Sequence, residues 1–336
     1  MMGISESADQ MPSANIDRFK PLPFFQRYGR QIGLPVIVVT LIVLFTANSE
    51  VFFSVANFRN IGVSAAALAA VSFGQTFAIL TAGLDLSVGS IVALVSIVGA
   101  IVMRDHGIPV GLIASLVTGA GVGLVNGIVI TRFKVFPFIA TLAMMSIVSG
   151  LALSLSGGVA VTGVPGAFAD LAYELVLGVP APVIIALLVL LTAFVVLKYT
   201  RLGRRIYAVG GNEEAARLSG IRIGAIKTAA YVSSGICAAV GSIILTARVA
   251  SGQPSLGTTL PLESVAAVVL GGISLFGGRG SVVGVAFGVL FVSILSNGLN
   301  LLNVPSYTQM MVIGGALILA VALDQAFIES RIGKKA

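Results

Sequence analysis

Apolar residues divide the chain into ten hydrophobic segments separated by short polar connections. A helix needs about 20 predominantly apolar residues to cross the hydrocarbon core of a bilayer. Most of the segments approach that length, so the pattern predicts an all-α integral membrane protein with about ten transmembrane helices. The segments span residues 33–48, 60–80, 87–103, 108–130, 136–155, 179–197, 227–247, 262–275, 281–302 and 305–323. The eighth segment is short, and those at 33–48 and 87–103 are marginal in length. Such shortness is typical of a tilted neighbour, a thinned bilayer or a broken helix.

Basic residues are distributed unevenly among the connections. If the N-terminus lies in the cytoplasm and the chain crosses ten times, seventeen of the 20 Lys and Arg residues fall on the cytoplasmic side. Only Arg59, Arg104 and Arg248 fall outside. An excess of Lys and Arg in short cytoplasmic connections indicates orientation. We therefore expect both termini in the cytoplasm, with tails at 1–32 and 324–336 around a membrane domain at 33–323.

Composition excludes a water-soluble domain. Charged residues make up 10% of the chain and hydrophobic residues 57%, whereas a typical soluble domain has about 25% charged residues. The net charge of +7 does not indicate nucleic-acid binding, because the basic residues lie in short connections between apolar segments. The single cysteine, Cys237, excludes an internal disulfide and a cysteine-based metal site.

One connection is long, polar and basic. Residues 198–227 read KYTRLGRRIYAVGGNEEAARLSGIRIGAIK and are expected on the cytoplasmic side. A helix-forming polar connection on that face is typical of a docking site for a soluble partner. On the other side, the connection 156–180 is rich in Gly and Pro and has no Lys or Arg. It is either an ordered loop that receives a soluble partner or a plain connector.

Two glycine series have helical spacing. Four-residue spacing places each series on one helix face, where small residues allow close helix packing. The sequence is consistent with packing of these faces either within the chain or across a dimer. The series are Gly119, Gly123 and Gly127, and Gly280, Gly284 and Gly288.

Candidate polar residues for a substrate path lie in or beside the apolar segments. Asp85 lies in GLDLSVGS (83–90), and an acidic group at membrane depth indicates function unless it caps a helix. A looser version of this stretch, GISLFGGRGS at 272–281, hints at an internal repeat of the kind that transporters have. Amides and hydroxyls can bind a polar solute or join neighbouring helices. The candidates are Gln75, Asp85, Ser87, Asn126 and Asn297.

Catalytic signatures are absent from the sequence. It contains no G-x-x-x-x-G-K-[ST] phosphate loop, and no segment carries a row of charged residues. We expect no cofactor and no metal in this chain and no enzyme activity of its own. Energy for transport would then come from a partner or from an ion gradient.

Three stretches resemble a known family. GLDLSVGS at 83–90, AVGGNEEAARLSGI at 208–221 and GGISLFGGRGSVVG at 271–284 resemble the membrane permease subunits of bacterial ATP-binding-cassette importers, in the ribose/xylose/galactose-type group. With the ten-segment layout, the resemblance extends from about residue 33 to 323. The Ile-x-Leu-Pro that follows the glycine in many such permeases is missing, as is common in sugar permeases.

The resemblance implies a multi-pass subunit of a bacterial inner membrane and a set of partners. Two permease copies, or this chain and a sister permease, would form the path for a monosaccharide or similar polyhydroxy solute. Separate ATPase subunits would bind ATP and Mg²⁺, and a periplasmic binding protein would deliver the solute. The helix that couples to the ATPase would comprise Gly211, Asn212, Glu213, Glu214, Ala215, Ala216, Arg217 and Gly220.

Other functions remain open on the sequence alone. Related permeases for branched-chain amino acids or nucleosides share the layout. A secondary transporter driven by an ion gradient would need an ion site, for which Asp85 and Glu263 are the acidic candidates. A non-transporting scaffold is consistent with the glycine faces but gives the polar 198–227 connection no purpose.

Overall fold

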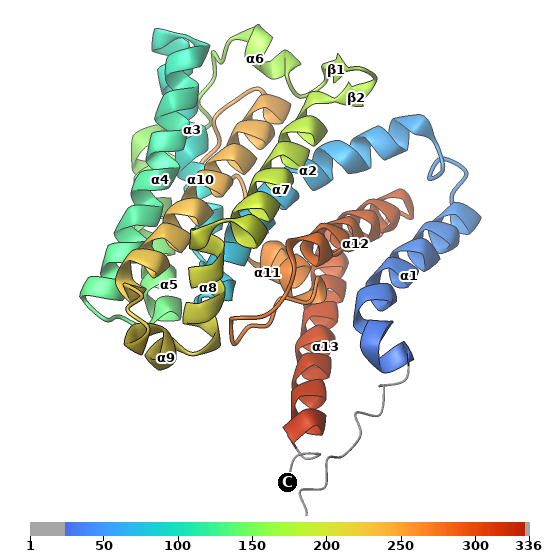
Figure 1. Cartoon of the computed structure of the whole chain (residues 1–336). Coiled ribbons are helices and arrows are strands. Elements are labelled where there is room, and N and C mark those ends of the chain that lie inside the picture. Colours follow the sequence, from blue (N-terminus) through green and yellow to red (C-terminus); the bar gives the residue numbers. More distant parts are fainter. Residues whose placement is uncertain (1–23, 333–336) are drawn as a thin grey trace, which may run out of the picture.

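A computed structural model describes the backbone of residues 24–332 and the side chains of residues 33–319, 321 and 322. Within this range the chain is almost entirely helical (Figure 1). Seven helices are long and apolar enough to cross a membrane: α2 (Val55–Leu80), α3 (Val88–His106), α4 (Ile108–Arg132), α5 (Pro137–Ser156), α7 (Ala181–Tyr199), α10 (Ile223–Val249) and α12 (Val282–Leu301).

The other three predicted segments also contain one helix each. They are α1 (Phe24–Asn48), α11 (Leu260–Leu270) and α13 (Ser306–Ile332), whose described apolar parts are shorter. The all-helical class is therefore confirmed, and ten crossings remain a prediction. The expected tails at 1–32 and 324–336 lie outside the residues with described side chains.

The eighth predicted segment, 262–275, is wrong at its C-terminal end. α11 stops at Leu270, because Gly272 adopts a φ of +88°. The amide of Ile273 then donates to the Val268 carbonyl at 3.2 Å, which closes the helix end. Residues 271–281 form a turn before α12.

α2 is the central helix of the molecule. Its most apolar window is 89% buried, whereas the corresponding windows of α4, α5 and α7 are 22% to 28% buried. Small residues explain this position, because Gly74 lies against Ser234 and Cys237 of α10, where an added methyl would lie 2.6 Å from the Cys237 Cβ. The outer helices expose Leu, Ile and Val side chains, as expected of a protein whose surroundings are lipid.

The first predicted glycine series, and two of the three glycines of the second, form packing faces within the chain. Gly119, Gly123 and Gly127 bring α4 against α10, and a methyl on Gly123 would lie 2.3 Å from the Tyr231 carbonyl oxygen. Gly284 and Gly288 bring α12 against α11 in the same way. Gly280 was expected on the same helix face, but it precedes α12, which begins at Val282.

The turns after α2 and α11 share a geometry. Ala82 has a φ of +57°, and Gly83 donates to the Ala78 carbonyl, just as Ile273 donates to Val268 after α11. In each turn a side-chain oxygen then accepts from the amide two residues on: Asp85 from Ser87, and Ser274 from Phe276. The sequence similarity between 83–90 and 272–281 is therefore accompanied by a similar turn geometry.

The two ends of the molecule differ in character. Figure 1 shows the start of α1, the end of α13 and the helices α8 (Arg201–Gly211) and α9 (Glu213–Leu218) at its lower end. The opposite end holds α6 (Gly166–Asp170) and a hairpin of β1 (Leu175–Val176) and β2 (Val179–Pro180), paired antiparallel. The 156–180 connection is thus ordered, and Val161 also bridges to Gly252.

Candidate coupling site

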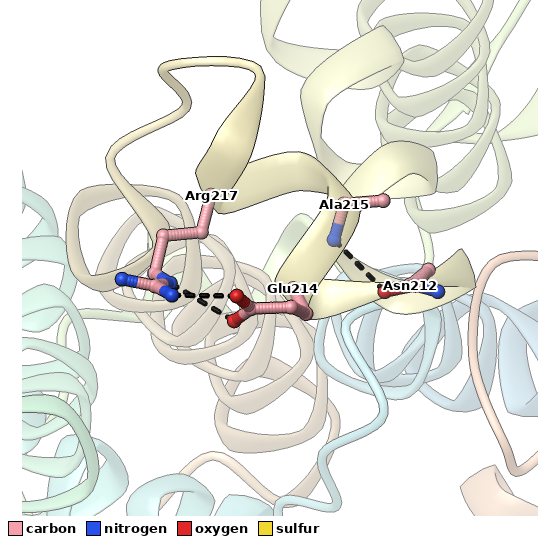
Figure 2. A network of polar contacts seen from close by, with 4 residues as sticks. All are labelled: Asn212, Glu214, Ala215 and Arg217. Carbon is pink, nitrogen blue, oxygen red and sulfur yellow. Dashed lines mark hydrogen bonds and ion pairs between the residues drawn. The ribbon is translucent and has the colours of Figure 1, made fainter.

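Two short helices, α8 and α9, form the polar connection between α7 and α10. The Thr200 hydroxyl accepts a hydrogen bond from the Gly203 amide at 3.2 Å, which caps α8. The Asn212 side-chain oxygen accepts from the Ala215 amide at 2.9 Å, which caps α9 (Figure 2). Thr and Asn suit these positions because their side chains satisfy amides that have no partner within the helix. The sequence therefore specifies two separate helices with a break at Asn212.

Charged side chains on α9 suit a short helix. Glu213 and Glu214 lie in its first turn, where the positive end of the helix dipole favours carboxylates. Arg217 donates to both carboxylate oxygens of Glu214, at 2.9 and 2.5 Å (Figure 2), and this raises the pKa of Arg217. Lys227 at the start of α10 contacts Glu213 at 2.6 Å. Exposed pairs contribute little stability. The Arg217–Glu214 pair lies within α9, whereas the Lys227–Glu213 pair joins α9 to α10.

α9 buries one of its residues and exposes the rest. Ala216 is 4% exposed and packs in the main core, whereas Leu218 is 77% exposed. After the helix, Gly220 adopts a φ of +77° and Ile221 donates to the Ala216 carbonyl at 3.1 Å. Gly220 thus ends α9 in the left-handed conformation, which glycine adopts without steric cost. The result is a small, oriented helix with charged and apolar atoms on its outer surface.

α8 is held against the rest of the protein by close backbone contact. A methyl on Gly210 would lie 1.7 Å from the Leu80 carbonyl oxygen, at the C-terminal end of α2. Leu80 accepts a hydrogen bond from the Gly278 amide at 3.0 Å, and a methyl on Gly278 would lie 2.5 Å from the Gly211 Cα. Three chain segments far apart in sequence thus meet without intervening side chains.

Tyr207 adds a side-chain contact to the same junction. Its hydroxyl donates to the Gly280 carbonyl at 3.0 Å. Partial burial raises the pKa of this hydroxyl, which keeps it a neutral donor. α8 is therefore fixed to the 271–281 turn at two points, Gly210–Gly278 and Tyr207–Gly280.

The three stretches that carry the family resemblance meet at or beside this junction. Sequence reasoning singled out each stretch but did not predict that they meet, and it missed Leu80, Tyr207, Gly210 and Gly278. The available signal was the glycine pairs at 210–211 and 277–278 in otherwise different contexts. A glycine pair in a polar connection favours close backbone approach, but the sequence does not name the opposing backbone.

Asp85 is the centre of a buried hydrogen-bond network next to the junction. Its Oδ1 accepts from the Ser87 amide at 3.1 Å and from the Ser87 hydroxyl at 2.6 Å. Its Oδ2 accepts from the Ser234 hydroxyl of α10 at 2.8 Å. Asn126 of α4 donates to the Ser87 hydroxyl at 2.8 Å, and Thr141 of α5 donates to the Leu84 carbonyl at 3.1 Å.

This network departs from a simple helix cap. Ser87 precedes α3 without a side-chain cap, and Asp85 accepts only one backbone amide there. Its other oxygen ties the 83–87 turn to α10. The turn therefore links α3, α4, α5 and α10 through polar contacts. A displacement of the turn would strain the hydrogen bonds to all four helices.

The remaining polar candidates fall into two groups. Asn57 and Asn297 donate to one another's side-chain oxygens, both at 3.0 Å, and join α2 to α12. By contrast, both polar atoms of Gln75, with Ser72 Oγ and Asn126 Oδ1, are buried and have no hydrogen-bond partner among the described residues. Asn297 is thus an inter-helix tie, whereas Gln75 and Asn126 keep unused hydrogen-bonding capacity. In the described part of the chain no group of three or more His, Cys, Asp or Glu residues lies where it could hold a metal ion.

The helices and the exposed α8–α9 connection define a multi-pass membrane protein of the permease type. Residues 57–321 match the family model described as "Branched-chain amino acid transport system / permease component". The chain belongs to this family.

Similar proteins of named function narrow the assignment within this family. The chain is 43% identical over 294 residues to the ribose import permease protein RbsC of Escherichia coli strain K12, covering 86% of this chain and 92% of the relative. It is 40% identical over 303 residues to RbsC of Bacillus subtilis strain 168, covering 89% and 93%. It is 34% identical over 323 residues to the D-allose transport system permease protein AlsC of E. coli K12, covering 96% of each. No solved structure matches the chain.

The protein is therefore a permease subunit of an ATP-binding-cassette importer, and a transport component rather than an enzyme. The family resemblance drawn from the three stretches is confirmed. The comparisons support this function over an ion-gradient-driven transporter and over a scaffold.

Proposed function

We propose that this permease carries a monosaccharide, of the pentose or hexose class, into the cell. The observation that carries the proposal is the near full-length similarity to permeases named for ribose, allose and arabinose. The family description also names branched-chain amino acids. Uncharged, buried hydrogen-bonding groups such as the Gln75 amide suit a polyhydroxy solute better than an amino-acid zwitterion, which needs charged partners.

The α8–α9 connection is the proposed docking site for the ATPase subunits, which would bind ATP and Mg²⁺. It is exposed, is tied to α10 by the Lys227–Glu213 pair, and makes close backbone contact with α2 and with the 271–281 turn. A push on α8 would therefore be transmitted to both segments, because close-packed backbone has no compressible side chain between its parts.

The Asp85 network is the proposed gating element. It begins five residues after Leu80, which accepts the Gly278 amide at the α8 junction. A displacement of α2 at that end would carry the 83–87 turn with it. Gln75, Asp85, Ser87, Asn126 and Asn297 are proposed to act along this path, Asn297 by holding α12 to α2 and Gln75 and Asn126 by offering free polar atoms.

The same proposal includes the orientation of the chain in the membrane and the partners that complete the importer. The chain would cross a bacterial inner membrane ten times with both termini, α8 and α9 in the cytoplasm. A second copy or a sister permease would complete the path. The end with α6 and the β-hairpin would face the periplasmic binding protein.

The substrate class is tested by uptake. The permease, its ATPase and its binding protein are expressed in cells that lack their own pentose and hexose importers, and labelled ribose, allose, arabinose and leucine are supplied. We expect uptake of one or more sugars and none of leucine. Uptake of leucine alone would overturn the sugar assignment while leaving the permease family intact.

A further inference from the structure

A second feature, separate from the coupling site, is a groove between α7 and α12. It has a volume of about 380 Å³ and is open to the surroundings. Every residue that lines it is apolar: Leu187, Leu190, Leu191, Phe194, Val283, Ala286, Phe287 and Leu290. A groove with no polar group on its walls suits a hydrocarbon chain.

The groove lies at the α8 end of the two helices. Phe194 is five residues from the end of α7, and Val283 is the second residue of α12. Beyond these ends, Thr200 leads directly into α8, and the Tyr207 hydroxyl reaches Gly280 in the turn before α12. The apolar walls therefore give way to a polar layer at that end of the groove.

The charged residues of the two chain segments that form this layer are all basic. Neither residues 181–212 nor residues 264–323 contain an Asp or Glu. Among the described residues, no ion pair joins a carboxylate to the basic side chains here, which are Lys198, Arg201, Arg204, Arg205 and Arg279. The Lys198 ammonium lies 5.0 Å from the centroid of the Phe194 ring, so a cation directly adjoins the groove wall.

We propose that this groove binds an anionic phospholipid, with an acyl chain along α7 and α12 and the phosphate near Lys198 and Arg279. Basic pockets between membrane helices recognise anionic headgroups, and each Lys or Arg near the surface adds to the attraction. A second copy of the chain fits less well, because a two-fold contact through this face would bring the same cations together without compensating carboxylates.

The sequence supplies a clean reporter, because it contains no tryptophan. Phe194→Trp places a single tryptophan on the groove wall, and Leu187→Trp places one further along it. Ile128→Trp is the matched control: it is exposed on α4 and lies four residues before Arg132, as Phe194 lies four residues before Lys198. The full-length variants are reconstituted with brominated phosphatidylglycerol or brominated phosphatidylcholine, each mixed with the other lipid unbrominated.

In both groove variants, Phe194→Trp and Leu187→Trp, we expect phosphatidylglycerol to quench the introduced tryptophan at least about twofold more than phosphatidylcholine, because cations enrich anionic lipid locally. The control should show a smaller preference, and Lys198→Gln with Arg279→Gln should remove the preference at Phe194→Trp. Equal quenching by both lipids at both groove reporters would overturn the proposal. So would protection from both lipids, which would indicate that a second protein chain fills the groove.

Discussion

Gly210 has no room for a side chain, whereas a methyl added to its neighbour Gly211 would meet no atom within 4 Å. The two residues share a helix and a sequence context, so only the opposing backbone distinguishes them. That backbone, Leu80 at the end of α2, is distant in sequence and lies three residues before the GLDLSVGS stretch. The proposed coupling between α8 and α2 depends on such contacts between single residues.

The first prediction compares these two glycines. Gly210→Ala should destabilise the junction by about 1–3 kcal/mol, because a methyl would overlap the Leu80 carbonyl oxygen. Gly211→Ala should be neutral in stability. Thermal unfolding midpoints of the purified variants and their sugar uptake measure the difference. Equal loss in both variants would contradict the geometry of the junction.

The second prediction concerns the Asp85 network. Asp85→Ala leaves the Ser87 and Ser234 hydroxyls without their acceptor, and should lower stability by about 1–3 kcal/mol and reduce uptake. Ser234→Ala removes only the tie to α10 and should reduce uptake with a smaller loss of stability. Uptake that is unchanged in both variants would remove the gating role.

At this scale the sequence predicted some features and missed others. The turn at Gly220 follows from local chemistry, since a glycine after a short helix favours a left-handed end. The contacts of Gly210 and Asp85 depend on residues about 70 to 150 positions away. No local pattern contains that information.

The helices were predicted from the sequence more completely than the contacts between single residues. Each of the ten hydrophobic segments contains a helix, because length and apolarity fix a helix wherever backbone groups cannot reach water. The one clear error is the end of the eighth segment. Hydropathy continues through Ile273 and Leu275, but a positive φ at Gly272 ends the helix at Leu270.

Helix pairing gives the third prediction, on α4. Gly123→Ala would place a methyl 2.3 Å from the Tyr231 carbonyl oxygen and should separate α4 from α10, at a cost of about 1–3 kcal/mol. Gly121 is on the open side of the same helix, so Gly121→Ala should leave the stability of the protein unchanged. Thermal stability of both variants in the same detergent checks the face assignment, and a larger loss for Gly121→Ala would reverse it.

For the whole molecule, the distribution of charge predicts opposite sides for two exposed loops. Leu177, at the hairpin tip, is 99% exposed, and Leu218 on α9 is 77% exposed. In a Cys237→Ala background, Leu177→Cys should react with an impermeant maleimide added from the periplasmic side. Leu218→Cys should react only after the membrane is opened. The reverse labelling would contradict the predicted orientation.

The central claim is that α9 and its glycine turn couple this permease to an ATPase. The most direct measurement is ATP hydrolysis by the complete importer in proteoliposomes, with and without the sugar-loaded binding protein. The unmodified complex and the Gly121→Ala complex, in which a methyl on α4 meets no atom within 4 Å, should be stimulated. Gly220→Val, which forces a branched side chain into a φ of +77°, and Glu214→Lys, which sets two cations side by side, should abolish stimulation. Full stimulation in both variants would show that the ATPase couples elsewhere.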